Sequence, residues 1–222
     1  MFDKIAPRYD LLNRLLSGGV DQIWRRKAIA LLRKTRPRSI LDVATGTADL
    51  AIMVARLDPD RIVGVDIAEE MLEIGRRKIR RKGLSDLIEL RFGDAEKLPF
   101  SDNQFDAVLV GFGVRNFEDL PEGLTQMHRV LKSGGTLIVL EFSRPTAFPI
   151  TQLYGFYGSR ILPLIGKIVS GDEGAYTYLP DSIAAFPDGE DFLNVMRSVG
   201  FSGVRQHRLT FGIASIYFGK AG

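Results

Sequence analysis

The chain has 222 residues, of which 45% are apolar and 26% are charged, and its formal net charge is +3. This balance is typical of a folded globular protein with a sizeable core, and it argues against disorder. The chain contains no cysteine, which excludes disulfides, thiolate metal sites, iron–sulfur clusters and a cysteine nucleophile.

The charge is concentrated near the N-terminus. Residues 1–40 contain ten Lys or Arg and three Asp, a local charge of about +7. A charge cluster of this kind is most often a solvated helix face, although it also suits an anionic lipid or nucleic acid. No stretch reaches the roughly 18 consecutive apolar residues of a membrane span, and the opening MFDKIAPRYD lacks the apolar run of a signal peptide. We therefore expect a cytoplasmic protein.

Helix and strand patterns alternate along most of the chain. Helical periodicity predicts helices over residues 9–16, 21–33, 49–56, 69–82, 120–131 and 189–199. Apolar runs bounded by turns predict strands over residues 39–44, 61–66, 87–94, 105–112, 134–142, 203–210 and 214–219. This alternation predicts an α/β, Rossmann-like fold with a mostly parallel seven-stranded sheet and an antiparallel C-terminal strand.

The alternation is interrupted between residues 143 and 187, a stretch rich in proline, glycine and aromatic residues. We interpret it as a lid inserted over the carboxyl edge of the sheet. One domain is therefore expected, with N-terminal helices over residues 1–38 and a cofactor-binding core over residues 39–142. The lid occupies residues 143–187, and a C-terminal helix and hairpin occupy residues 188–222.

Residues that follow successive parallel strands should meet at one crevice. In the first loop, ATGTAD, a dinucleotide-binding GxGxxG pattern would read Ala44, Gly46 and Asp49, and an aspartate that opens a helix repels a pyrophosphate. NAD is therefore disfavoured. S-adenosylmethionine carries no phosphate, and its ammonium and carboxylate suit an acidic environment at Asp42 and backbone amides around Gly46 and Thr47.

Two further carboxylates suit the rest of that cofactor. Asp66 ends the second strand, where a carboxylate can bind both ribose hydroxyls, although it could also cap a helix. Asp94, followed by Ala95, can accept a hydrogen bond from the exocyclic amine of adenine. Ile67 and Gly111 are predicted to line the same site, Gly111 through its backbone.

Four segments carry a resemblance to a known family. They are residues 1–27, LDVATGTADL, GFGVRNFEDL and RVLKSGGTLIVLEFS, and GAYTYLPDSIAAFP in the insertion also matches. Together they resemble the quinol C-methyltransferases of menaquinone and ubiquinone biosynthesis, which have a class I S-adenosylmethionine-dependent fold. The resemblance covers nearly the whole chain, and the spacing specific to it joins Tyr9, Asp10, Asn13, Ser17 and Trp24.

The resemblance implies a reaction and its residues. Thr47, Asp66, Asp94 and Ala95 would bind the cofactor, and Arg115 and Asn116 would belong to the reaction site, with Tyr9 as a further catalytic candidate. The substrate would be a polyprenyl quinol, with demethylmenaquinol ranked before a methoxybenzoquinol. No metal is expected, and the sequence leaves a homodimer open.

Methylation of a ring carbon needs an electron-rich ring held in line with the methyl group. Arg115, after the fourth strand, is expected to stabilise phenolate-like charge, unless it only ties down the lid. The general base stays open among Asp94, Tyr9 and a water held by Arg115 and Asn116. His128 and His207 follow no cofactor strand and are expected to be structural.

A lipid-soluble substrate suggests contact with a membrane surface, at the inner face of the cell membrane. The basic and apolar residues expected to contribute are Arg14, Arg25, Arg26, Lys27, Leu11, Leu12, Leu15, Leu16, Trp24, Phe148, Leu153, Tyr154, Phe156 and Tyr157.

Two other function classes compete with this reading. A nucleic-acid methyltransferase would suit the basic N-terminus and the RRKIRRK helix, but GFGVRN lacks the Asn-Pro-Pro-aromatic loop that holds an extruded base. A cofactor-binding module without activity would bind S-adenosylmethionine and turn over no quinol. The sequence therefore favours an enzyme that acts on a quinol, with no nucleic-acid partner.

Overall fold

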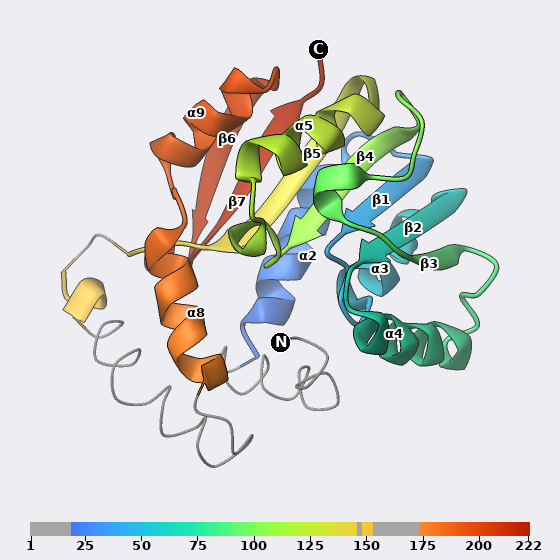
Figure 1. Cartoon of the computed structure of the whole chain (residues 1–222), viewed down its shortest axis with the longest axis horizontal. Helices are drawn as coiled ribbons and strands as arrows, with labels where there is room; N and C mark the ends of the chain where they lie inside the picture. Colours follow the sequence, from blue (N-terminus) through green and yellow to red (C-terminus); the bar gives the residue numbers. More distant parts are fainter. Residues whose placement is uncertain (1–18, 146–147, 153–173) are drawn as a thin grey trace.

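The computed structural model describes residues 19–145, 148–152 and 174–222, and for residues 174–179 it describes the backbone alone. Its centre is a seven-stranded sheet in the order β3-β2-β1-β4-β5-β7-β6 (Figure 1). The strands are β1 (Ser39–Val43), β2 (Arg61–Asp66), β3 (Ile88–Phe92), β4 (Phe105–Gly111), β5 (Leu131–Phe142), β6 (Ser202–Leu209) and β7 (Ala214–Lys220). The longer helices are α2 (Asp21–Arg33), α3 (Asp49–Val54), α4 (Glu69–Arg81), α5 (Leu120–Val130), α8 (Gly174–Ala185) and α9 (Glu190–Ser198).

The first five strands are parallel, and β7 runs antiparallel to both β5 and β6. The predicted mostly parallel sheet with an antiparallel C-terminal strand is therefore confirmed. The chain builds the sheet outward in one direction from β1 to β3 and in the other direction from β4 onward, and the switch lies between β1 and β4, which pair with each other. In an open sheet of this kind, ligands bind outside the carboxyl ends of the strands at that point.

Both faces of the sheet are covered by helices, which explains the continuous apolar character of its central strands. Side chains alternate between the faces: Leu41 and Val43 lie in the cluster with α5 and α9, whereas Ile40 lies in the cluster with α2, α3 and α4. Each layer is thus a separate apolar core, and together they hold the loops at the carboxyl edge in place.

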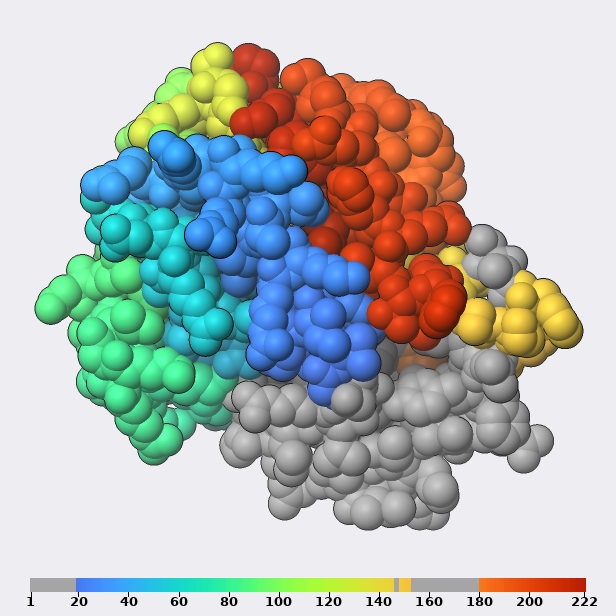
Figure 2. All heavy atoms as spheres, turned by 180° about the vertical axis from the view of Figure 1, so that it is seen from behind, coloured from blue at the N-terminus to red at the C-terminus, as the bar shows by residue number. Residues whose placement is uncertain are grey.

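Helix α2 packs beside the C-terminal hairpin, as Figure 2 shows from behind. The indole Nε1 of Trp24 donates to the Thr210 Oγ1 over 2.7 Å, and the indole ring meets Phe142 edge-on. Trp24 is only 3% exposed and Arg25 only 8%. The expectation that these two residues face a membrane is therefore wrong, because one fills the core and the other lies beneath a loop.

Several predicted boundaries shift by a few residues. β5 begins at Leu131 rather than at residue 134, because Leu131 already pairs with Phe105 before a register shift and the turn at Gly134. Conversely, β3 stops at Phe92, so Asp94 lies beyond the strand at the start of a short 3-10 helix, η2 (Ala95–Lys97). α3 ends at Val54 and continues as η1 (Ala55–Leu57).

Some predictions fall on residues that the structure does not describe. They are the helix over residues 9–16 with Tyr9, and about half of the predicted lid, of which residues 143–145, 148–152 and 174–187 are described. Across the described ranges, every helix is too short or too polar to cross a bilayer.

Candidate active site

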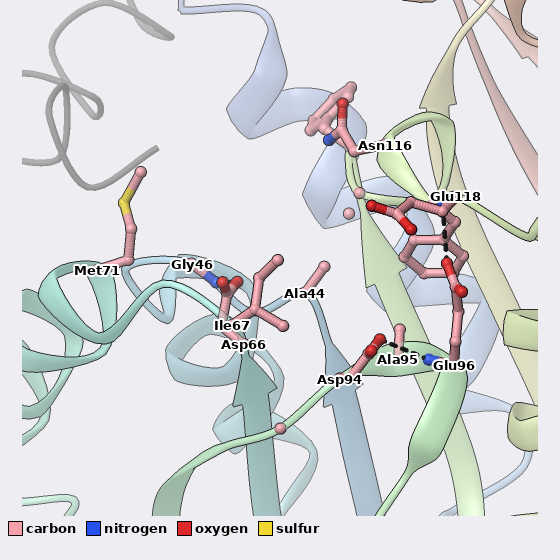
Figure 3. Close-up of a pocket in the computed structure, with 15 residues that line it drawn as sticks. Ala44, Gly46, Asp66, Ile67, Met71, Asp94, Ala95, Glu96, Asn116 and Glu118 are labelled. Atoms are coloured by element: carbon pink, nitrogen blue, oxygen red, sulfur yellow. Dashed lines mark hydrogen bonds between the residues drawn. The ribbon is translucent and has the colours of Figure 1, made fainter. Parts of the chain in front are cut away.

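A pocket of about 230 Å³ opens at the carboxyl edge of the sheet, among the loops that follow β1 to β4. Figure 3 shows Asp66 and Ile67 on one side of it and Asp94, Ala95 and Glu96 on another. Its lining residues are Ala44, Gly46, Asp66, Ile67, Met71, Gly93, Asp94, Ala95, Glu96, Gly111, Phe112, Gly113, Asn116, Phe117 and Glu118. Six of the predicted cofactor-binding residues therefore lie together in this lining: Gly46, Asp66, Ile67, Asp94, Ala95 and Gly111.

The loop after β1 is wound tightly by three residues with positive φ, namely Ala44 (52°), Gly46 (55°) and Ala48 (64°). Alanine adopts this conformation at a cost of about 1 kcal/mol or more, so the surrounding contacts must hold it. One of them is Gly113, where a Cβ would lie 2.5 Å from the Cβ of Ala44. The glycine after β4 thus lets two loops of the pocket approach each other.

Asp66 is held by the backbone at the end of β2. Its Oδ2 accepts from the Gly46 N–H over 2.7 Å, and its Oδ1 accepts from the Ala68 N–H over 2.9 Å. These two backbone bonds fix the orientation of the carboxylate. Asp66 therefore presents an oriented anion to the pocket, which suits a vicinal diol.

Asp94 caps the short helix η2 by accepting from the Glu96 N–H over 2.9 Å, and Ala95 is buried beside it. Glu96 in turn accepts from the N–H groups of Glu118 and Asp119, over 2.7 and 3.0 Å. Glu96 therefore joins the loop after β3 to the start of α5 and shapes the pocket wall. The sequence analysis did not find it.

Two predicted cofactor residues have side chains behind the pocket lining. The Thr47 hydroxyl accepts from the Lys78 Nζ over 2.8 Å, on the side of α4. Asp42 is almost fully buried, and its Oδ2 accepts from the Thr45 Oγ1 over 2.7 Å. Burial raises the pKa of Asp42 to about 7, while the Thr45 hydrogen bond and the positive charge of Arg25 act in the opposite direction.

Arg115 follows β4 in the 3-10 turn η3 (Val114–Asn116), but the contacts described for it lie inside the protein. Its Nη1 binds the Glu141 Oε1 over 2.9 Å and the Phe112 carbonyl over 2.5 Å, and it is absent from the pocket lining. Its charge is thus balanced by a buried carboxylate. Its neighbour Asn116 does line the pocket (Figure 3).

The pocket lies on a doubly wound sheet, and its acidic residues disfavour a ligand that carries a phosphate. A sequence model of the ubiE/COQ5 methyltransferase family matches residues 1–221. The chain belongs to this family.

Relatives agree with this assignment. A demethylmenaquinone methyltransferase from Bacteroides fragilis is 51% identical over 98% of this chain and 89% of its own length. One from Thermus thermophilus is 50% identical over 99% of both chains. A ubiquinone/menaquinone biosynthesis C-methyltransferase UbiE from Geobacter sulfurreducens is 47% identical and covers the whole chain, with 87% of its own length matched.

Solved structures show the same fold. A SAM-dependent methyltransferase from Thermotoga maritima superposes with a TM-score of 0.66 over 100% of both chains at 21% identity. The cyclase SpnF superposes with a TM-score of 0.69 over 99% of this chain and 93% of its own, at 18% identity. These structures share the Rossmann-like fold with this chain, and the family match together with the relatives confirms the predicted enzyme class, an S-adenosylmethionine-dependent methyltransferase.

Two residues that were not predicted from the sequence carry signals that could have identified them, one in the pocket lining and one behind it. Phe112 lines the pocket with a φ of 62°, and the glycines on both sides of it mark an unusual turn. Glu141 is the one charged side chain within the apolar run LIVLEF, which is a signal for a buried charge with a partner. Its partner, Arg115, could not be identified from spacing.

Neither histidine lines the pocket. His128 lies on α5 and is half-buried. Its ring meets the ring of Phe201, just after α9, edge-on, with the two ring centroids 5.0 Å apart. His207 lies on β6 at the far edge of the sheet, opposite Ile216 of β7. Both positions agree with a structural role and leave the general base to other groups.

Proposed function

We propose that this family member transfers a methyl group from S-adenosylmethionine to a ring carbon of demethylmenaquinol, the last step of menaquinone biosynthesis. The observation that supports it most is the convergence of Asp66 and Asp94 on one pocket, beside a loop that opens α3 with an aspartate. Such a site favours a ligand with hydroxyls, an amine and no phosphate. The names of the relatives from Bacteroides fragilis and Thermus thermophilus support the substrate.

The pocket offers groups for each part of the cofactor. Asp66 is the acceptor for the ribose hydroxyls, and Asp94 with Ala95 is the edge that accepts from the adenine amine. Gly46 and Gly111 contribute backbone to the wall. Asp42 and Thr47 lie behind the lining. They act on the cofactor indirectly, through the electrostatic field and through the shape of the loop after β1. When bound, S-adenosylmethionine supplies a methyl group already activated by its sulfonium.

The protein's remaining task is to orient the ring and to accept protons. Asn116 lines the pocket after β4 and can hold a quinol oxygen by hydrogen bonding. A carbon–carbon bond would form at the ring carbon as the bond between the methyl group and sulfur breaks, and the ring carbon would then lose its hydrogen as a proton. The candidate acceptors are Asp94, Tyr9 and a water held near Asn116. Tyr9 lies outside the described residues.

A benzoquinol is the second candidate substrate, because the relative from Geobacter sulfurreducens carries a name for both quinone pathways. The deciding experiment is a turnover assay with S-adenosylmethionine and both quinols, reduced and with the same prenyl tail. We expect the naphthoquinol to be methylated with the higher kcat/KM. Faster turnover of the methoxybenzoquinol would reverse the ranking, and turnover of neither would remove the proposed function.

The substrate also places the enzyme at a membrane surface. A polyprenyl tail partitions into lipid at about 0.8 kcal/mol per buried CH₂, so the head group must be captured where the bilayer ends. The described residues suited to this contact are exposed Arg26 and Lys27 on α2, the half-exposed Ile23, and Phe148, which is 83% exposed. We place the attachment at the inner face of the cell membrane, with the lid over the bound head group.

A further inference from the structure

A fully enclosed carboxylate lies at the end of β5, and the reaction proposed above gives it no part. The Glu141 side chain is 0% exposed. Its Oε1 accepts from the Phe142 N–H over 2.8 Å and from the Arg115 Nη1 over 2.9 Å, and its Oε2 accepts from the Arg115 N–H over 3.4 Å. Burial raises the pKa of Glu141, and the Arg115 charge acts against that rise. The carboxylate thus holds one residue by both its side chain and its backbone.

Arg115 extends this contact in two further directions. Its Nη1 donates to the Phe112 carbonyl over 2.5 Å, and Phe112 lines the pocket. Its Nε donates to the Ser182 Oγ over 3.3 Å, on helix α8 of the insertion. One buried pair therefore links the loop after β4, the end of β5 and the insertion.

We propose that Glu141 is a positioning residue: through Arg115 it fixes the loop of residues 112–116, which carries Asn116 into the pocket, against helix α8. The physical argument is that a buried ion pair adds little net stability, because desolvation offsets the attraction, whereas its directional hydrogen bonds define a geometry. Glu141 accepts from both the guanidinium and the backbone N–H of Arg115, and these two contacts restrict both the position and the rotation of the η3 turn.

The position of this loop matters for the reaction. Asn116 is fixed within η3 by its own N–H, which donates to the Gly113 carbonyl over 3.0 Å, so a shift of Arg115 carries Asn116 with it. A displacement of about 1 Å at a substrate-orienting group can cost roughly a hundredfold in rate. The proposed cofactor carboxylates need not move, because Asp66 ends β2 and Asp94 follows β3.

The test is Glu141→Gln, which keeps the size of the side chain and removes its charge. We expect kcat for the quinol to fall about tenfold or more, while the Kd for S-adenosylmethionine changes less than about threefold. The matched control is Glu89→Gln on β3. It removes an exposed carboxylate that binds Arg61 of β2 and Arg91 of β3. It should leave kcat unchanged.

The double variant Glu141→Gln/Arg115→Gln separates positioning from stability. Two amides leave no unpaired buried charge, so the double variant should recover much of the Tm lost in Glu141→Gln, while kcat stays low. Ser182→Ala, which removes the hydrogen bond between Arg115 and α8, should raise the KM for the quinol with little effect on Tm. A double variant that regains kcat together with Tm would reduce Glu141 to a stabilising residue and overturn the proposal.

One readout is independent of the substrate. Trp24 is the single tryptophan, and its ring lies 6.2 Å from Phe112 and 6.1 Å from Phe142, next to the Glu141 network. Glu141→Gln should shift its emission, and an unchanged spectrum or a wild-type kcat would overturn the proposal. Because the kinetic readout rests on the proposed function, a shifted spectrum in an enzyme whose wild type methylates no quinol would refute that function and support the positioning role.

Discussion

The backbone N–H of Gly46 donates to the carboxylate of Asp66 over 2.7 Å, which ties the loop after β1 to the end of β2. The two residues are 20 positions apart, and both line the pocket. The glycine lies at a φ of 55°, which directs its N–H toward β2. The loop after β1 and the end of β2 therefore hold each other in place at the proposed cofactor site.

The first prediction concerns Asp66. Asp66→Ala should weaken the binding of S-adenosylmethionine by about 1–3 kcal/mol, because the ribose hydroxyls lose a charged acceptor and the Gly46 loop loses its anchor. Titration calorimetry measures this directly, with Asp86→Ala at an exposed position as the control. An unchanged Kd would move the ribose site away from β2.

Arg115→Ala should lower turnover by roughly a hundredfold or more while leaving cofactor affinity nearly intact, because the loop that carries Asn116 loses its anchor to Glu141. It should also lower the free energy of unfolding by about 3–5 kcal/mol, because Glu141 is left buried without its positive partner. Steady-state kinetics and denaturant unfolding give the two values. Wild-type turnover, or a loss confined to cofactor binding, would contradict this role.

Asp42 should make the stability of the protein depend on pH. Burial raises its pKa in the folded chain to about 7, from the ordinary aspartate value of 3.8, so the folded state keeps a proton that the unfolded state releases. The stabilising contribution is complete below about pH 4 and is lost as the pH rises to about 7, a change of roughly 4 kcal/mol. Urea unfolding across this range measures it.

Asp42→Asn removes the titrating group and keeps its shape. The variant should therefore gain stability relative to the wild type as the pH rises from about 4 to 7, whereas exposed Asp86→Asn should show no such trend. Parallel curves for the wild type and Asp42→Asn would show that Asp42 has an ordinary pKa in the folded protein.

Binding to vesicles tests the membrane surface. Sedimentation with vesicles should rise with the anionic lipid fraction and fall with salt, at about 1 kcal/mol for each basic residue near the surface. Arg26→Gln/Lys27→Gln should reduce it more than the control Lys132→Gln/Arg197→Gln, which removes two exposed charges elsewhere. Equal binding to neutral and anionic vesicles would rule out the electrostatic part.

The sequence alone determined the succession of the strands along the chain and, to within two residues, the positions at which β1 to β4 end. The apolar runs that predicted β1, β2 and β4 are buried on both faces and bounded by turns, and β3 alternates buried and exposed residues, so local pattern was sufficient. Because parallel strands end at one edge, the convergence of Asp66 and Asp94 followed from chain order. The same local evidence excluded a pyrophosphate at the start of α3.

Only the tertiary structure decided where side chains point and what neutralises them. Arg115 meets Glu141, 26 residues later, and Ser182, 67 residues later. Asp42 lies beneath the loop whose sequence suggested a direct contact, and Arg25 lies there with it instead of on the surface. Periodicity specifies which face of an element is apolar, but the partner of a buried charge depends on how layers distant in sequence pack together. That packing turned Arg115 inward, toward the buried carboxylate of Glu141.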